Sequence, residues 1–215
     1  MIKKGQHKEN NFISFWKAMP SELEGRLRKA AVHIHFKNGE HVFRENDKYR
    51  GVFFVESGYF KWYMLGEDRH SVVIKIFEAG EIAGLPPLFD APPQQYIANL
   101  VSIGKGSLFF WPASTFKQLI RIYPDYIFVF NRYITATVKQ LALAKAAVTS
   151  KSVDMRVEDY LQSLGASDAW VSLPMPKRQI AFALNTSAET FSRALARLQK
   201  QGRLLHNSGS YRLSV

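Results

Sequence analysis

The chain has 215 residues, which is enough for one large domain or two smaller ones. Its hydrophobic fraction of 47% indicates folded cores rather than disorder, and the absence of cysteine excludes disulfide bonds and cysteine-ligated iron–sulfur clusters. The formal net charge of +11 favours a polyanionic partner, with nucleic acid ahead of an anionic membrane.

Residues 1–11 are polar and are expected to form a loose arm, without the apolar region of a secretory signal. No apolar run approaches the length of a membrane span, so a soluble cytoplasmic protein without a membrane partner is expected. Residues 12–16 and 21–31 follow as two helical segments. In the second, Ser21 and Glu24 have the spacing of a capping box.

Between residues 32 and 112 the pattern changes to short apolar runs separated by turn residues such as Ser57-Gly58. Many short strands with regular turns predict a β-sandwich or a β-barrel. The predicted strands are 31–36, 41–43, 51–56, 58–65, 71–77, 97–102 and 107–111.

Residues 126–148 are predicted to form one long helix, because apolar positions recur every three and four residues. Such a seam can pack on the chain's own barrel or against the same helix of a second copy. The seam consists of Ile127, Phe130, Ile134, Thr137, Leu141, Ala144 and Val148. Residues 149–152 are the predicted hinge, and 153–164 a further helix.

Residues 176–200 are predicted to form two short helices joined by a tight turn. Pro176 suits the start of the first helix, and Asn185 tolerates the left-handed backbone that ends it. Either Thr186 or Ser187 can cap the second helix. Apolar residues recur at helical spacing in both helices, at Ile180, Ala181 and Leu184 and at Phe191, Leu195 and Leu198.

The second of these helices carries a polar face, and a hairpin signal over residues 204–213 follows it. Such side chains read base edges and phosphates in a major groove. The alternative interpretation is an ordinary helical hairpin with a solvated basic face. The candidate DNA-binding residues are Lys177, Arg178, Thr186, Ser187, Glu189, Thr190, Ser192, Arg193, Arg197, Lys200 and Arg212.

Residues 186–193 resemble the recognition helix of the Crp/Fnr family of bacterial transcription regulators, and the Glu-x-x-Ser-Arg form is similar to the Fnr branch. In that family the arginine, here Arg193, reads guanine, and the glutamate, here Glu189, accepts from cytosine. The cyclic-AMP receptor branch has arginine where this chain has Ala188. The resemblance therefore implies a TTGA-like inverted repeat as the DNA site.

The resemblance also implies an α+β fold. Residues 1–125 would form a jelly-roll sensor barrel of the cyclic-nucleotide-binding type with N-terminal helices, 126–149 a dimerisation helix and hinge, and 150–215 a winged helix-turn-helix. The turns at Gly39-Glu40, Glu56-Ser57-Gly58 and Gly80-Glu81 resemble those of that barrel. The implied partners are double-stranded DNA, a second copy of the chain, RNA polymerase and a small-molecule or haem effector.

The segment 80–89 aligns with the family's phosphate-binding cassette. The positions that would hold the ribose and the cyclic phosphate contain Leu85, Gln95 and Tyr96, none of which supplies a charge. Cyclic AMP is therefore rejected as the effector. The expected pocket is apolar and aromatic, and its candidate residues are Tyr63, Gly84, Leu85, Phe89, Tyr96, Ile97, Phe130 and Ile134.

Several interpretations of this pocket stay open. It can be a plain core, an apolar-ligand pocket, or a haem pocket that senses a diatomic gas such as nitric oxide, with His33, Met64 or His70 as available axial ligands. The protein can also bind DNA without any effector. A cupin-type metalloenzyme is disfavoured: His33, His35 and Glu40 fit part of its motif, but Leu27 replaces a glycine and a histidine is missing. No catalytic residue and no metal site are predicted.

Overall fold

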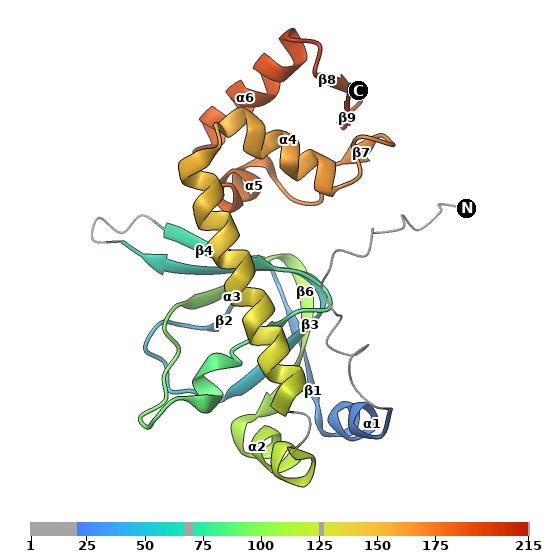
Figure 1. Cartoon of the computed structure of the whole chain (residues 1–215). Coiled ribbons are helices and arrows are strands. Elements are labelled where there is room, and N and C mark those ends of the chain that lie inside the picture. Colours follow the sequence, from blue (N-terminus) through green and yellow to red (C-terminus); the bar gives the residue numbers. More distant parts are fainter. Residues whose placement is uncertain (1–20, 67–70, 125–126, 215) are drawn as a thin grey trace. The chain divides into compact units, whose positions relative to one another are not determined.

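The computed structural model describes residues 21–66, 71–124 and 127–214 (Figure 1). The chain divides into two compact units, one made of the described residues up to Leu141 and the other of those from Ala142 onward. The predicted arm at residues 1–11 and the predicted helix at 12–16 lie outside the described residues.

The first unit begins with helix α1 (Ser21–Ala30) and continues into a six-stranded sheet in which every pairing is antiparallel. The strands are β1 (Val32–Phe36), β2 (His41–Phe43), β3 (Gly51–Leu65), β4 (Ser71–Phe77), β5 (Ile82–Ala83) and β6 (Asn99–Pro112). Their order is β1-β6-β3-β4, with β2 also paired to β6 and β5 to β3. The unit also contains the 3-10 helix η1 (Pro86–Phe89), helix α2 (Ala113–Ile122) and the part of helix α3 (Ile127–Ser150) up to Leu141; the rest of α3 belongs to the second unit.

Strands β3 and β6 are each continuous where the sequence predicted two shorter strands. The glycine signals at Gly58 and Gly104 adopt positive φ, but the chain bends there and the strands go on. A Cβ on Gly58 would lie 2.7 Å from both Gly106 Cα and Lys105 O, so glycine is needed because β3 and β6 approach closely at this bulge. Helix α2 has no counterpart among the predicted elements.

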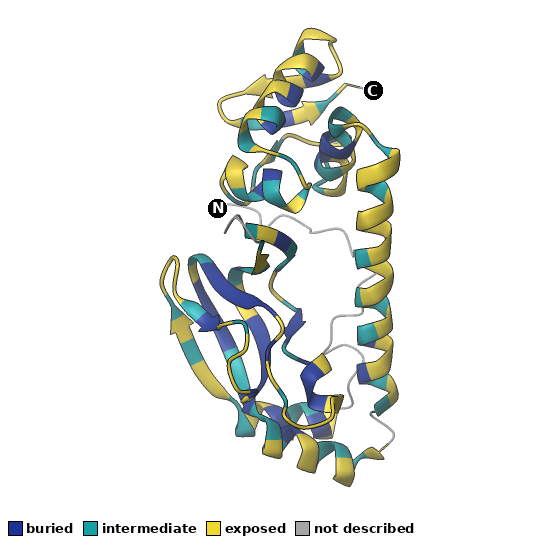
Figure 2. Ribbon diagram, turned by 90° about the vertical axis from the view of Figure 1, so that its left-hand side faces the viewer, coloured by how far each residue is buried: buried dark blue, intermediate teal, exposed yellow. Residues whose placement is uncertain are grey.

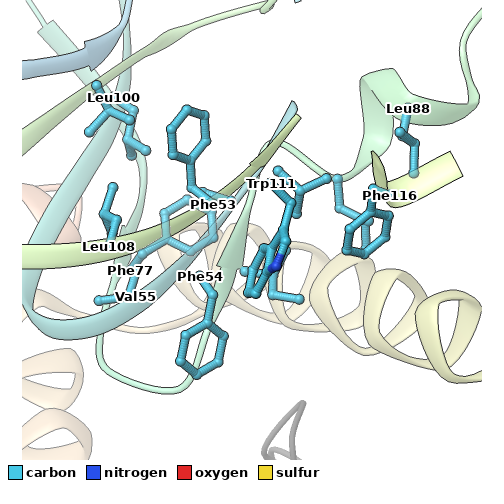
Figure 3. Close-up of a cluster of buried hydrophobic side chains, with 14 of the residues drawn as sticks. Phe53, Phe54, Val55, Phe77, Leu88, Leu100, Leu108, Trp111 and Phe116 are labelled. Carbon is cyan, nitrogen blue, oxygen red and sulfur yellow. The ribbon is translucent and has the colours of Figure 1, made fainter. Parts of the chain in front are cut away.

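The core of the first unit is strongly aromatic. Trp111 is fully buried, donates its indole N–H to the carbonyl of Leu27 at 2.7 Å, and lies with its ring centroid 6.2 Å from that of Phe116 (Figure 3). Phe53 and Phe54 on β3 extend the same cluster. Removing this apolar area from water drives α1 and α2 onto the sheet.

Helix α3 confirms the long predicted helix, but its predicted seam is divided. Phe130 is buried in the core of the first unit and Ile134 packs against that core, so this half of the seam faces the core of the chain's own sheet unit. The large apolar residues that remain exposed on α3 are Phe128, Val138, Leu143 and Val148. Figure 2 shows the exposed second half of the helix in yellow.

The second unit contains α4 (Val153–Ser163), β7 (Val171–Ser172), α5 (Lys177–Ala183), α6 (Ala188–Lys200), β8 (Leu204–Asn207) and β9 (Ser210–Leu213). The strands form an antiparallel sheet in the order β7-β9-β8. Val157, Ile180, Phe191 and Leu198 are fully buried together in a core of its own. The predicted helix pair and hairpin are therefore confirmed, and with the sheet of the first unit they confirm the α+β fold.

Candidate nucleic-acid interface

The turn between α5 and α6 has the predicted left-handed residue, Asn185, at φ +51°. Behind the turn lies Arg156 of α4, a buried side chain whose Nη1 donates to the carbonyl of Leu184 at 2.7 Å. A cation at the end of α5 satisfies carbonyls that the helix leaves unpaired. Ala181 is fully buried, which lets the two helices approach closely. The sequence interpretation did not find the role of Arg156.

Helix α6 begins at a cap formed by Ser187, one of the two residues predicted for that role. Its Oγ accepts a hydrogen bond from the backbone N–H of Thr190 at 3.0 Å and lies 2.8 Å from Thr190 Oγ1. The cap fixes the first turn of α6 because it satisfies an N–H that has no partner inside the helix. The hydroxyls of both predicted contact residues are thus already engaged within the helix start, and Thr186 beside them is half-buried.

The outward face of α6 presents Glu189, Ser192 and Arg193, all of them exposed. Arg193 Nη2 donates to Glu189 Oε1, and this ion pair joins two residues that lie one helical turn apart. The opposite face buries Phe191 and Leu198 in the core of the unit. A helix fixed on one face and bearing a paired cation and anion on the other can present a donor fork and an acceptor to base edges.

The basic residues around α6 fall into two groups. Lys177, Arg178, Lys200 and Arg212 are exposed, as the sequence predicted for phosphate contacts. Arg197 differs, because it donates from Nε and Nη2 to the two carboxylate oxygens of Asp154, at 3.0 and 2.5 Å. The hydrogen bond to Asp154 also raises the pKa of Arg197. The sequence predicted Arg197 as a phosphate contact, whereas the structure ties it to α4.

Strands β8 and β9 form the predicted wing. Ser208 and Gly209 at its turn have φ values of +47° and +82°, which is the pattern of a tight two-residue hairpin turn. His206 stacks on Tyr211 with 4.7 Å between ring centroids, and Arg212 follows on the exposed side of β9. The wing thus places a cation and polar tip residues beside α6.

The structure does not gather the eight predicted effector residues around one cavity. Leu85, Tyr96 and Phe130 are buried in the core, where Tyr96 stacks on Phe43 at 3.8 Å and donates its hydroxyl to the carbonyl of Gly51. Phe89 and Ile97 are instead 47% and 60% exposed. Of the other three, Ile134 packs against the core, Tyr63 lies 3.0 Å from His41 through its hydroxyl, and the carbonyl of Gly84 accepts from Tyr49.

Polar groups that the sequence interpretation missed link α3 to the sheet. Lys75 and Glu81 form an ion pair at 2.8 Å, with side chains only 11% and 9% exposed. Lys75 also donates to Gln140 of α3 at 3.1 Å. The hydroxyl of Tyr133 on α3 accepts from the N–H of Ile82 at 2.8 Å and donates to its carbonyl at 3.1 Å. Burial raises the pKa of the Tyr133 hydroxyl above its ordinary value.

A cavity of about 420 Å³ opens elsewhere on the first unit, and none of the predicted effector residues lines it. Two arginines and two acids balance its charge, and burial, followed by the charges of Arg44 and Lys61, lowers the pKa of His41 within it. The lining residues are His35, Phe36, Glu40, His41, Val42, Phe43, Arg44, Asp47 and Arg50.

The metal-site interpretation gains no support from the residues that the structure describes, which hold no group of three or more histidine, aspartate or glutamate side chains placed for a metal ion. His33 and His35 do lie together, with ring centroids 4.4 Å apart, but His33 Nε2 is engaged with Glu56 Oε2 at 2.5 Å. Of the other possible haem ligands, Met64 is exposed and His70 lies outside the described residues. Within the described ranges, none of the helices has the length and apolarity needed to cross a membrane.

In a comparison with known protein families, each of the two units matches one family. Residues 33–123 match the cyclic nucleotide-binding domain family, and residues 155–214 match the Crp-like helix-turn-helix domain family. The transcriptional activatory protein AadR of Rhodopseudomonas palustris is 25% identical over 189 residues, covering 85% of this chain and 77% of that protein. The transcriptional activator protein FnrA of Stutzerimonas stutzeri is 23% identical over 175 residues, covering 78% of this chain and 70% of that protein.

Among solved structures, the c-di-GMP responsive global regulator CLP of Xanthomonas campestris superposes with a TM-score of 0.75 at 18% identity. The match covers 91% of this chain and 100% of that chain, so it supports the fold over nearly the whole length. The first matched domain corresponds to the sheet unit of this chain, and the second corresponds to its helix-turn-helix unit. The chain therefore belongs to the Crp/Fnr family of DNA-binding transcription regulators, which are not enzymes.

Proposed function

We propose that the chain is a cytoplasmic, dimeric regulator that reads a TTGA-like inverted repeat in double-stranded DNA and acts on transcription through RNA polymerase. The observation that carries the proposal is the exposed Glu189–Arg193 pair on α6. Arginine donates a bidentate fork to guanine O6 and N7, and glutamate accepts from cytosine N4. One G·C base pair can therefore satisfy both side chains, because its guanine can accept from the arginine and its cytosine can donate to the glutamate.

The neighbouring bases are read by smaller groups. Ala188 supplies no donor, and the hydroxyls of Ser187 and Thr190 are engaged in the helix cap. Methyl groups on this face favour apolar contact with thymine, which supports thymines in the outer half-site.

Dimerisation is supported by the apolar side chains that α3 leaves exposed, including Val138 and Leu143. A single winged helix-turn-helix reads one half-site, whereas a two-fold dimer places two recognition helices about one turn of DNA apart. An inverted repeat is the DNA counterpart of that symmetry.

Binding to labelled duplexes tests the proposal. At fixed salt, an inverted repeat of TTGA should bind much more tightly than a duplex with a single half-site or with both half-sites scrambled. Equal affinity for the three duplexes would contradict sequence-specific reading by a dimer, since the phosphate contribution is the same in each.

The effector is not cyclic AMP in this proposal. Leu85 and Tyr96 occupy positions that would need charged or phosphate-binding groups, and both are buried in the core. Calorimetry with cyclic AMP should give no heat of binding, and micromolar binding would overturn this part. A Soret band in the absorption spectrum of protein purified from haem-supplemented cells would identify a haem effector.

A second candidate is regulation without any effector, and the buried Lys75–Glu81 pair favours it. The pair, with Gln140 and Tyr133, already links the sheet to α3, which is the contact that an effector in this region would otherwise have to make. Protein that is unfolded, stripped of small molecules and refolded should then bind the inverted repeat as tightly as untreated protein. A loss of affinity that cell extract restores would favour an effector instead.

A further inference from the structure

Two acids on α4 hold arginines from elsewhere in the second unit. Asp154 accepts two hydrogen bonds from Arg197, and Glu158 accepts one from Arg203 at 2.5 Å. Asp154 and Glu158 are four residues apart, so they lie on the same face of α4. Their side chains are only 20% and 19% exposed, so both carboxylates are largely shielded from water.

The two arginines lie at the end of the recognition helix α6 and at the start of the wing. Arg197 lies in the last turn of α6, and Arg203 immediately precedes β8, the first strand of the wing. One face of α4 therefore contacts the end of the recognition helix and the beginning of the wing. The bidentate geometry of Arg197 on Asp154 fixes orientation as well as distance.

A phosphate contact by Arg197 would have to displace this arrangement. Moving the guanidinium to DNA would leave the carboxylate of Asp154 shielded and without its partner, which is costly. The exposed Lys200, three residues further along α6, has no such restraint from Asp154. The chemistry of the site thus separates Arg197 from the phosphate-binding residues.

We propose that Arg197 and Arg203 are positioning residues, and that the Asp154–Arg197 and Glu158–Arg203 pairs hold α6 and the wing in the orientation that reads DNA. This inference rests on the proposed function, because it needs a sequence-specific complex as its readout. If Arg197 is a positioning residue, it does not contribute to the salt dependence of the DNA affinity.

Four variants test the proposal on the inverted repeat across a salt series: Asp154→Asn, Arg197→Ala, Lys200→Ala and Asp159→Asn. Asp154→Asn removes a negative charge, so simple electrostatics predicts tighter binding. Loss of positioning predicts weaker binding by roughly two- to thirtyfold, the effect of one surface ion pair in each of two half-sites. Arg197→Ala should weaken binding to a similar extent, with the slope of log affinity against log salt unchanged.

The controls separate charge from position. Lys200→Ala should reduce the magnitude of the salt slope by about 1.8, one phosphate contact in each of two half-sites. Asp159 of α4 pairs with Lys151 rather than with α6, so Asp159→Asn should not weaken binding. The Asp154→Asn/Arg197→Ala double variant should bind no worse than the weaker single variant, because both remove one interaction. Asp154→Asn and Arg197→Ala should also each discriminate less well against a single-base change at the guanine.

Three results would overturn the proposal. The first is Asp154→Asn binding as tightly as wild type, or more tightly. The second is Arg197→Ala lowering the salt slope as Lys200→Ala does. The third is a loss of thermal stability with affinity and base discrimination unchanged in protein that circular dichroism shows to be folded. If wild type itself does not prefer the inverted repeat, the proposed function fails instead.

Discussion

At the scale of single side chains, the ion pair between Arg193 and Glu189 forms within α6 itself, before any base is present. Each side chain restrains the other, so less conformational freedom remains to be lost when the pair meets a base pair. This restraint supports the proposal that the pair reads a G·C base pair rather than contacting phosphate alone.

The first prediction concerns this pair. Arg193→Ala should cost roughly 1–3 kcal/mol of binding free energy per half-site and relax discrimination at the guanine. Glu189→Ala should relax selectivity at the same base pair but weaken total binding less, because it also removes a charge that phosphate repels. Competition binding against duplexes substituted at that position measures both effects. Base preferences that stay unchanged in both variants would show that α6 is not the reading helix.

The role of Arg156 at the end of α5 becomes visible only in the folded structure. Its Nη1 donates to Leu184, 28 positions away, so no local pattern of residues indicates the contact. We expect Arg156→Met to lower the free energy of unfolding of the second unit by roughly 1.5–3 kcal/mol, since a partly buried carbonyl loses a charged donor. Arg178→Met, at an exposed position of α5, should change it little. Denaturant unfolding followed by circular dichroism compares the two, and equal effects would contradict the assigned role.

Glu56 gives the first unit a defined pH dependence. The hydrogen bond from Ser107 at 2.6 Å, and then the contact with His33, lower the pKa of Glu56 below its ordinary value of 4.5. A lowered folded-state pKa stabilises the protein above 4.5, and this contribution is lost as the pH falls through 4.5 and below. The stability advantage of wild type over Glu56→Gln should therefore shrink between pH 6 and pH 3. In an NMR titration, Ser107→Ala should raise the Glu56 pKa; an unchanged pKa would remove Ser107 as its cause.

At the scale of elements, the sequence predicted what local chemistry determines. The cap at Ser187, the left-handed Asn185 and the apolar faces of α5 and α6 all follow from residues within a few positions of one another. Pairings between distant segments were missed. The Gly58 signal was interpreted as a turn because only the approach of β6 shows that it is a bulge, and the Lys75–Glu81 pair depends on how β4 meets its neighbours.

Helix α3 illustrates the same limit. The period of its apolar residues predicted the helix, but the side that meets the core of the first unit is set by packing, which turns Phe130 and Ile134 inward. Ile134→Asp would therefore perturb that core as well as any dimer. Val138 is 59% exposed and offers a cleaner test of the interface.

We expect Val138→Asp to give a monomer in light scattering while leaving the thermal stability of the sheet unit nearly unchanged. The physical reason is that an aspartate at this position is solvated in the monomer but would be buried and unpaired in a helix pair. Gln118→Asp, the same new charge at an exposed position of α2, should stay dimeric. A dimeric Val138→Asp protein would remove this face of α3 from the interface.

At the scale of the whole molecule, the net charge of +11 supplies attraction to any DNA, while in the proposed function specificity depends on a few residues of α6. The family assignment accounts for both units of the chain and for the order in which they occur. In the proposed function, two copies of this chain read one inverted repeat.

The most direct test is selection of bound sequences from a pool of randomised duplexes by the wild-type protein at moderate salt. A dimer that reads one inverted repeat should enrich two TTGA-like half-sites in inverted orientation, with centres about one helical turn, or roughly 10–10.5 base pairs, apart. Enrichment of isolated half-sites, of direct repeats, or of no motif at all would contradict it.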